Sequence, residues 1–240
     1  MAGHRQIVAM GGGGFSMEPM NLALDRYVLS LVERSRPRVC FLGTASGDSR
    51  GYARRFHAAF TALGAAETTD CSLFQPPTAD LRGYLLEKDI IYVGGGNTRS
   101  LMALWREWGL DTTLPDAWAQ GIVLAGISAG MICWFEQGIT DSVPGALREI
   151  DCLGLLPGSA CPHYDGEAER RPTYQRLIGA GAVVDGYAAD DGAALHFVGT
   201  ALDRVVMSRA GAHAYRVERH GGHAVETALE GTLLPSRPGR

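Results

Sequence analysis

Lysine is nearly absent from this sequence: Lys88 is the single one, and the other basic residues are arginines. The 22 basic and 26 acidic residues leave a net charge of −4, so electrostatics give no case for nucleic acid or an anionic membrane as partner. Charged residues make up only 20% of the chain and hydrophobic ones 46%, which excludes a disordered, highly charged chain.

Cysteines are few and show no pairing pattern. There are 5, an odd number without a CxxC pair, which disfavours a disulfide framework and indicates a reducing compartment. Cys161 lies near His163, but no second group of ligands has a spacing that would suit a metal ion. We therefore expect no metal site and no cofactor.

Long hydrophobic runs are also absent, since none approaches the roughly 18 residues of a membrane-spanning helix. The first 14 residues pass from a short apolar stretch into four glycines, which is typical of a strand entering a turn rather than of a signal peptide. We expect a cytoplasmic protein with no membrane partner. Its 240 residues suit one domain spanning 1–240, and the sequence is compatible with a homodimer without determining the oligomeric state.

Short apolar runs alternate with helical patterns over the first two thirds of the chain. The strand-like runs are 7–10, 39–43, 90–93 and 122–127, and the helical patterns are 20–34, 52–63 and 100–118. Alternation of this kind predicts an α/β fold in which helices cover both faces of a mostly parallel sheet. Each strand-like run ends at glycine, at the sheet edge where open parallel sheets bind ligands.

The last third of the sequence has a different texture. Four close-set strands are predicted at 194–198, 204–207, 212–217 and 224–229, as an antiparallel extension of the sheet edge. The stretch 138–166 is rich in glycine and proline, and a loop of that length in a compact domain is usually functional.

Two glycine clusters, 11–14 and 94–96, follow predicted strands. Neither completes the dinucleotide fingerprint or a phosphate-binding P-loop, so nucleotide binding is disfavoured. In Gly94-Gly95-Gly96-Asn97-Thr98 the glycines precede a predicted helix, so their amides can approach an anion or an oxyanion closely.

Gly126-Ile127-Ser128-Ala129-Gly130 is a G-x-S-x-G sequence between an apolar strand and a predicted helix at 131–137. This strand–turn–helix setting is what a nucleophilic serine requires, with the Ala129 amide available to an oxyanion. The alternative is a serine that merely caps a helix.

A nucleophilic serine needs a base and an orienting acid. His163, inside the irregular region, is the candidate base, and the candidate acids are Asp141, Glu149, Asp151 and Asp165. Asp141 follows Ser128 by 13 residues and precedes His163 by 22, which is too compact for an α/β-hydrolase. Asp190-Asp191-Gly192 is typical of a turn, with anchoring of a substrate amino group as the alternative.

These motifs together resemble the peptidase E family, which includes aspartyl dipeptidases and, more distantly, cyanophycinase. The resemblance rests on Gly94-Gly95-Gly96-Asn97-Thr98, on 126–130, and on Pro162-His163 followed by an acidic and arginine-rich stretch. It implies a three-layer α/β/α sandwich similar to class I glutamine amidotransferases, with serine in place of their cysteine.

The resemblance also implies roles for single residues. Ser128 matches the family nucleophile, His163 its base and Asp141 its acid, while Ala129 with the Gly95 and Gly96 amides matches the oxyanion hole. Asn97 is taken as a substrate contact. Family members that prefer Asp place an arginine after the histidine, but Arg170 and Arg171 do not align cleanly with it; a solvated loop paired with Glu167 and Glu169 is the alternative.

The function that follows from the sequence is a metal-free serine peptidase of small peptides, with N-terminal Asp as a candidate preference. Two other classes remain as alternatives: a non-catalytic binding protein on the same scaffold, and an amidotransferase-like enzyme. The first is disfavoured by the complete set of serine, acid and histidine, and the second by serine at the position of cysteine. The substrate side chain and the length of peptide accepted are left open.

Overall fold

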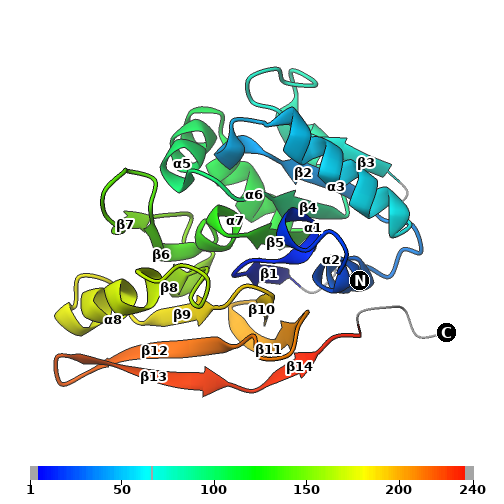
Figure 1. The fold of residues 1–240 in the computed structure, drawn as a ribbon. Helices are drawn as coiled ribbons and strands as arrows, with labels where there is room; N and C mark the ends of the chain where they lie inside the picture. The colour runs from blue at the N-terminus through cyan, green and yellow to red at the C-terminus, as the bar shows by residue number, and fades with distance from the viewer. Residues whose placement is uncertain (1–4, 66, 236–240) are drawn as a thin grey trace.

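A large mixed β-sheet lies at the centre of the computed structural model, which describes residues 5–65 and 67–235 (Figure 1). Its central parallel strands are built from the hydrophobic runs seen in the sequence, buried on both faces as strands covered on both sides must be. In spatial order the strands are β14 (Gly231–Leu233), β11 (Ala201–Met207), β10 (Ala193–Val198), β1 (Gln6–Met10), β5 (Val123–Ile127), β4 (Ile90–Val93), β2 (Arg38–Leu42) and β3 (Glu67–Asp70).

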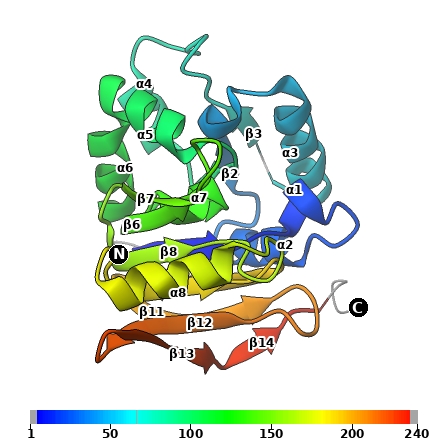
Figure 2. The ribbon, with the colours of Figure 1, turned by 60° about the vertical axis from the view of Figure 1, so that its left-hand side comes forward.

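Helices cover both faces of this sheet (Figure 2). One face holds an aromatic cluster in which Phe15, Phe56 and Phe60 pack on Phe41 and Tyr92. The helices on that face are α1 (Gly14–Met17), α2 (Ala23–Ser30) and α3 (Arg50–Ala62), and those on the other are α4 (Leu81–Leu86), α5 (Thr98–Glu107) and α6 (Leu110–Ala119). The expected three-layer α/β/α sandwich is thus confirmed.

A smaller second sheet packs beside the first and carries α8 (Arg170–Ala180) on its outer side (Figure 1). Its strands in spatial order are β13 (His223–Leu229), β12 (Ala214–His220), β9 (Gly186–Ala189), β8 (Leu156–Cys161), β6 (Phe135–Thr140) and β7 (Arg148–Asp151). Part of the stretch expected to be one long loop, 138–166, therefore forms strands.

The C-terminal strands divide between the two sheets. β10 and β11 extend the large sheet in antiparallel fashion, as expected, whereas β12 and β13 belong to the small one.

Two of the helices expected from the sequence differ in the structure. The pattern at 100–118 splits into α5 and α6 because Gly109, at φ 70°, adopts a left-handed conformation between them. After Ser128, α7 (Ala129–Ile132) is short and β6 begins at Phe135.

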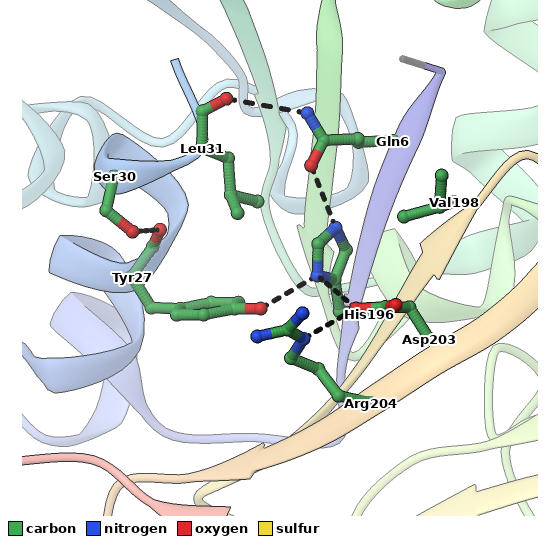
Figure 3. A pocket seen from close by; sticks show the side chains of 8 residues that line it. All are labelled: Gln6, Tyr27, Ser30, Leu31, His196, Val198, Asp203 and Arg204. Carbon is green, nitrogen blue, oxygen red and sulfur yellow. Dashed lines mark hydrogen bonds and ion pairs between the residues drawn. The ribbon is translucent and has the colours of Figure 1, made fainter. Parts of the chain in front are cut away.

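A cavity of about 460 Å³ lies near the amino end of β1, away from the strand ends that carry the glycine clusters (Figure 3). Buried His196 is bonded on both ring nitrogens there: Tyr27 Oη lies 2.7 Å from Nδ1, and Gln6 Oε1 lies 3.1 Å from Nε2. Burial lowers the pKa of His196, which keeps the ring neutral. The network fastens α2 to β1 and β10.

In the described part of the chain no helix has the length and apolar character needed to cross a membrane.

Asp25 is a carboxylic acid buried inside the aromatic face of the large sheet. Its side chain accepts hydrogen bonds from the Phe15 amide at 2.7 Å and from the Tyr92 hydroxyl at 3.4 Å, and so fixes the start of α1. Burial raises the pKa of Asp25 to about 7, against the opposing effect of these hydrogen bonds. An acid whose pKa is raised in the folded state gives stability that is present below its unfolded pKa and lost as pH rises through the folded value.

We therefore expect Asp25→Asn to remove a pH-dependent loss of stability. Between pH 5 and pH 8 the wild type should lose roughly 2–3 kcal/mol relative to the variant, because ionising Asp25 in the fold is unfavourable. Urea unfolding of both proteins at the two pH values measures this difference. Asp116→Asn, on an exposed face, is the control, and parallel pH profiles for the wild type and Asp25→Asn would contradict the expectation.

Candidate active site

Ser128 stands in a strained turn at the carboxyl end of β5. Its φ of 58° and ψ of −112° lie outside the regions that non-glycine residues normally occupy, at a cost of order 1–3 kcal/mol. The flanking glycines are required by close backbone contacts: a Cβ at Gly126 would lie 2.2 Å from the Gly130 carbonyl oxygen, and one at Gly130 would lie 2.3 Å from that of Val93. This packing explains the G-x-S-x-G spacing and presents the serine at the sheet edge.

His163 lies beside Ser128, since the two residues line one cavity of about 220 Å³. His163 Nδ1 is 2.6 Å from Asp191 Oδ1, a distance typical of a charge-assisted hydrogen bond. Because a carboxylate only accepts, Nδ1 carries the proton and Nε2 is left as the basic nitrogen. The backbone of His163 is also strained, with a φ of 53°.

The carboxylate bonded to His163 therefore belongs to Asp191, where the sequence had suggested Asp141. Asp141 instead lies 3.5 Å from Arg170 Nη2, and its side chain is 65% exposed. Asp191 had been interpreted as part of a turn. Its position at the end of a strand, with a glycine following, is the sequence signal that could have identified it, since β9 pairs with β8, the strand that precedes His163.

Asp165 and Arg209 hold the backbone of Asp191, and its side chain lies against Gly12. Its amide donates to Asp165 Oδ1 at 2.8 Å, and Arg209 Nε donates to its carbonyl oxygen at 2.8 Å. Gly12 bridges to Asp191, and a Cβ at Gly12 would lie 1.8 Å from Asp191 Oδ1. Glycine at 12 is thus what lets the carboxylate reach the imidazole.

The expected oxyanion donors lie next to Ser128. Ala129 begins α7, and a Cβ at Gly95 would lie 3.1 Å from Ser128 Cβ. The Gly95 amide donates to the Tyr52 hydroxyl at 3.2 Å, and that hydroxyl is 2.8 Å from Ser16 Oγ. Gly96 lines the cavities on both sides of Ser128. Tyr52 and Ser16 are site residues that no sequence motif indicated.

Asn97, expected to contact substrate, has both ends of its side chain engaged within the chain. Its Oδ1 accepts the Ser100 amide at 2.8 Å and caps α5, while Nδ2 donates to the Ser142 carbonyl at 3.0 Å. The residue thereby joins α5 to the segment after β6.

No group of three or more His, Cys, Asp or Glu side chains within 5–65 and 67–235 is arranged to hold a metal ion.

The side chains of the two arginines expected to contact substrate have different partners within the chain. Arg170 is buried, and its Nε donates to Glu167 Oε2 at 2.6 Å while Nη1 donates to the Ile139 carbonyl at 2.8 Å. Arg171 is 48% exposed, pairs with Glu226 and packs over the Tyr164 and Tyr215 rings. Each guanidinium is thus already paired with a carboxylate of the chain. The alternative of a solvated loop is also wrong for Arg170, which is buried and begins α8, although its pairing with Glu167 is present.

The fold and site together define an α/β protein with a strained serine at a strand–turn–helix junction and a histidine–aspartate pair beside it. The model of peptidase family S51 matches residues 7–205, and the chain belongs to that family, which makes it a peptidase. Among curated proteins it is 58% identical to the uncharacterized peptidase YgaJ of Bacillus subtilis (strain 168), covering 89% of this chain and 92% of that one. It is 30% identical to peptidase E of Escherichia coli O6:K15:H31 over 47% of this chain and 48% of that one.

Solved structures show the same fold at low identity. A peptidase from an acI-B1 actinobacterium matches with a TM-score of 0.68 and 17% identity, over 96% of each chain. A putative peptidase E from Listeria monocytogenes EGD-e matches with a TM-score of 0.59 and 17% identity, over 95% of this chain and all of that one. These structures confirm the fold, while the expected family is confirmed by the family model and by the curated relative from Bacillus subtilis.

The His163–Asp191 contact can be tested without a substrate. A proton shared between Nδ1 and a carboxylate 2.6 Å away is strongly deshielded, so we expect a proton resonance far downfield of the amides. Asp191→Asn should remove this resonance and Asp141→Asn should keep it. Proton NMR of the three proteins makes the measurement, and the opposite pattern would assign the contact to Asp141.

Proposed function

We propose that the chain is a serine peptidase that hydrolyses small peptides through Ser128, His163 and Asp191. The observation that carries this proposal is the 2.6 Å contact of Asp191 with His163 Nδ1, which leaves Nε2 as a base in the cavity it shares with Ser128. Asp191 replaces Asp141 in this assignment. The serine lies in a turn whose strain is typical of a functional position.

In this mechanism Ser128 Oγ attacks the peptide carbonyl carbon while its proton passes to His163 Nε2, and Asp191 stabilises the imidazolium. The tetrahedral intermediate collapses as Nε2 returns that proton to the leaving amine, which leaves an acyl group on Ser128. A water molecule then gives a proton to Nε2 and adds to the acyl carbon. Collapse of the second intermediate releases the acid and restores the serine hydroxyl.

The oxyanion of both intermediates is assigned to backbone amides. Ala129 N–H follows the nucleophile directly, and the Gly95–Gly96 loop lies against the serine side chain. Because the Gly95 amide donates to the Tyr52 hydroxyl, an oxyanion would replace that hydroxyl as its acceptor. A donor of this kind contributes roughly 3 kcal/mol to transition-state stabilisation.

The space around Ser128 favours short substrates. Cavities of about 220 Å³ and about 250 Å³ meet at Ser128 and Gly96, which suits one residue on each side of the cleaved bond. A preference for N-terminal Asp has no support from the arginines, because Arg170 and Arg171 are paired with Glu167 and Glu226. We therefore propose a dipeptidase-like activity without that preference.

Ser128→Ala should abolish peptide hydrolysis, because no other group replaces the attacking oxygen. The substitution removes one hydroxyl from a turn, so the unfolding midpoint should change little. Turnover of a dipeptide library and labelling by a fluorophosphonate, which reacts with activated serines, measure the effect. Retained turnover or retained labelling in the variant would remove Ser128 from the mechanism, and an inactive wild type would favour a non-catalytic binding protein.

Asp191→Asn should lower kcat by orders of magnitude, since an amide at this position stabilises the wrong imidazole tautomer. Asp141→Asn should affect kcat far less, because Asp141 contacts Arg170 and not the imidazole. Steady-state kinetics on one dipeptide compare the two variants. A crippled kcat in Asp141→Asn beside a normal kcat in Asp191→Asn would restore Asp141 as the triad acid.

A further inference from the structure

Tyr52 reaches the cavity beside Ser128 from a helix on the aromatic face of the large sheet. It belongs to α3, and its ring packs against Phe15 and Phe41 with centroid distances of 5.5 Å and 5.0 Å. The residue is only 6% exposed, yet it lines the cavity of about 220 Å³ that contains Ser128 and His163. A buried and firmly packed tyrosine thus borders the space that holds the proposed nucleophile and base.

The glycines of the 94–96 loop leave room for this ring and for the serine. A Cβ at Gly94 would lie 2.9 Å from Tyr52 Cε1, and one at Gly95 would lie 3.1 Å from Ser128 Cβ. The same loop therefore packs directly against both side chains, and glycine permits that approach.

The Tyr52 hydroxyl has two partners within the chain. The Gly95 amide donates to it at 3.2 Å, and Ser16 Oγ lies 2.8 Å away. Two hydroxyls carry two protons, but the bond between them uses only one. Among residues 5–65 and 67–235 no acceptor takes the other proton. The pair therefore holds one unused donor at the edge of the cavity.

The phenol is the better donor of the two hydroxyls. Burial raises the pKa of Tyr52, so its proton is retained at neutral pH. A phenol donates more strongly than an aliphatic alcohol, and hydrogen bonds accepted from Gly95 and Ser16 polarise its O–H bond further. A negative charge in the cavity thus favours the arrangement in which Ser16 donates to Tyr52 and the phenol proton faces the cavity.

An oxyanion on the substrate meets this proton. Because an N–H group donates close to its own axis, an oxygen that takes the Gly95 proton lies beside the Tyr52 hydroxyl, within hydrogen-bonding distance. Building on the serine mechanism proposed above, we propose that Tyr52 is a catalytic residue whose hydroxyl donates a hydrogen bond to the oxyanion. The hydroxyl changes from acceptor of the Gly95 proton to donor toward the substrate oxygen, and it keeps its proton throughout. Ser16 is a positioning residue for that hydroxyl.

Tyr52→Phe keeps the aromatic ring and removes only the hydroxyl. On the dipeptide that the wild type cleaves fastest, kcat should fall by about a hundredfold, as is typical for loss of one oxyanion donor. KM should change by less than about threefold, because charge on the substrate oxygen develops only in the transition state.

Tyr27→Phe is the matched control, since the Tyr27 hydroxyl contacts His196 at the cavity near the amino end of β1. This variant should leave kcat and KM unchanged. An unchanged or raised kcat in Tyr52→Phe would mean that the hydroxyl only occupies the Gly95 amide in the resting protein, and it would overturn the proposal.

A boronic acid gives a readout that a merely structural role would not change. When 1-aminoethylboronic acid adds to the protein, Ser128 Oγ bonds to boron, the serine proton passes to His163, and a boronate oxygen takes the place of the oxyanion. Calorimetry should show at least tenfold weaker binding to Tyr52→Phe. The wild-type complex should also show a downfield hydroxyl proton that is missing from the Tyr52→Phe complex, beside the His163 resonance in both. Equal affinities, or the same downfield protons in both complexes, would exclude Tyr52 as the donor.

Ser16→Ala separates the contributions of the two hydroxyls. The phenol keeps its proton in this variant and loses one partner, so kcat should fall by about tenfold, which is less than in Tyr52→Phe. The downfield hydroxyl proton of the boronate complex should remain. A larger fall in Ser16→Ala than in Tyr52→Phe would assign the donor to Ser16 and overturn the role of Tyr52.

Ser128→Ala and Tyr52→Phe together separate the serine mechanism from the role of Tyr52. A wild type without turnover and without fluorophosphonate labelling would overturn both. A wild type whose turnover is lost in Ser128→Ala, beside an undiminished kcat in Tyr52→Phe, would overturn the role of Tyr52 alone.

Discussion

The hydrogen bond between His163 and Asp191 is the contact on which the site depends, and it lies where the two sheets meet. His163 follows β8 and Asp191 follows β9, both strands of the small sheet, whereas Gly12 follows β1 of the large one. The chain crosses from the small sheet to the large sheet at 190–192, beside Gly12. Pairing of β8 with β9 brings the imidazole and its carboxylate together, and the bridge from Gly12 to Asp191 ties this pair to the large sheet.

Close backbone approach is what makes this arrangement feasible. At Gly12 a side chain would collide with Asp191, and at Gly126 and Gly130 it would collide with carbonyl oxygens of the chain. The strain at Ser128 is held by the strands around it, since its amide donates to the Met10 carbonyl at 3.0 Å. Buried parallel strands thus support an unfavourable turn that places a hydroxyl at the sheet edge.

The charges around Ser128 follow from where α8 begins. Arg170 is the first residue of that helix and is buried against β6, so a cation that a sequence pattern assigns to the substrate is used to hold two carboxylates of the chain. Arg171, one residue later, points to β13 and its neighbours and pairs with Glu226. Adjacent residues on a helix face different directions, and only one of this pair borders the cavity.

The sequence by itself determined the parallel α/β core, because buried strands are continuous apolar runs and helices repeat every 3.6 residues. It also singled out Ser128 and His163 through a local strand–turn–helix signal and a short motif, and the structure places both residues at one cavity. The sequence does not predict the strands inside 138–166, because edge and small-sheet strands such as β7 lack a continuous apolar pattern. Tertiary structure alone decided that Asp191 and not Asp141 contacts the imidazole, and that Arg170 is paired. Both depend on how two sheets and a helix pack, and residues 28 positions apart in the chain carry no local signal of their contact.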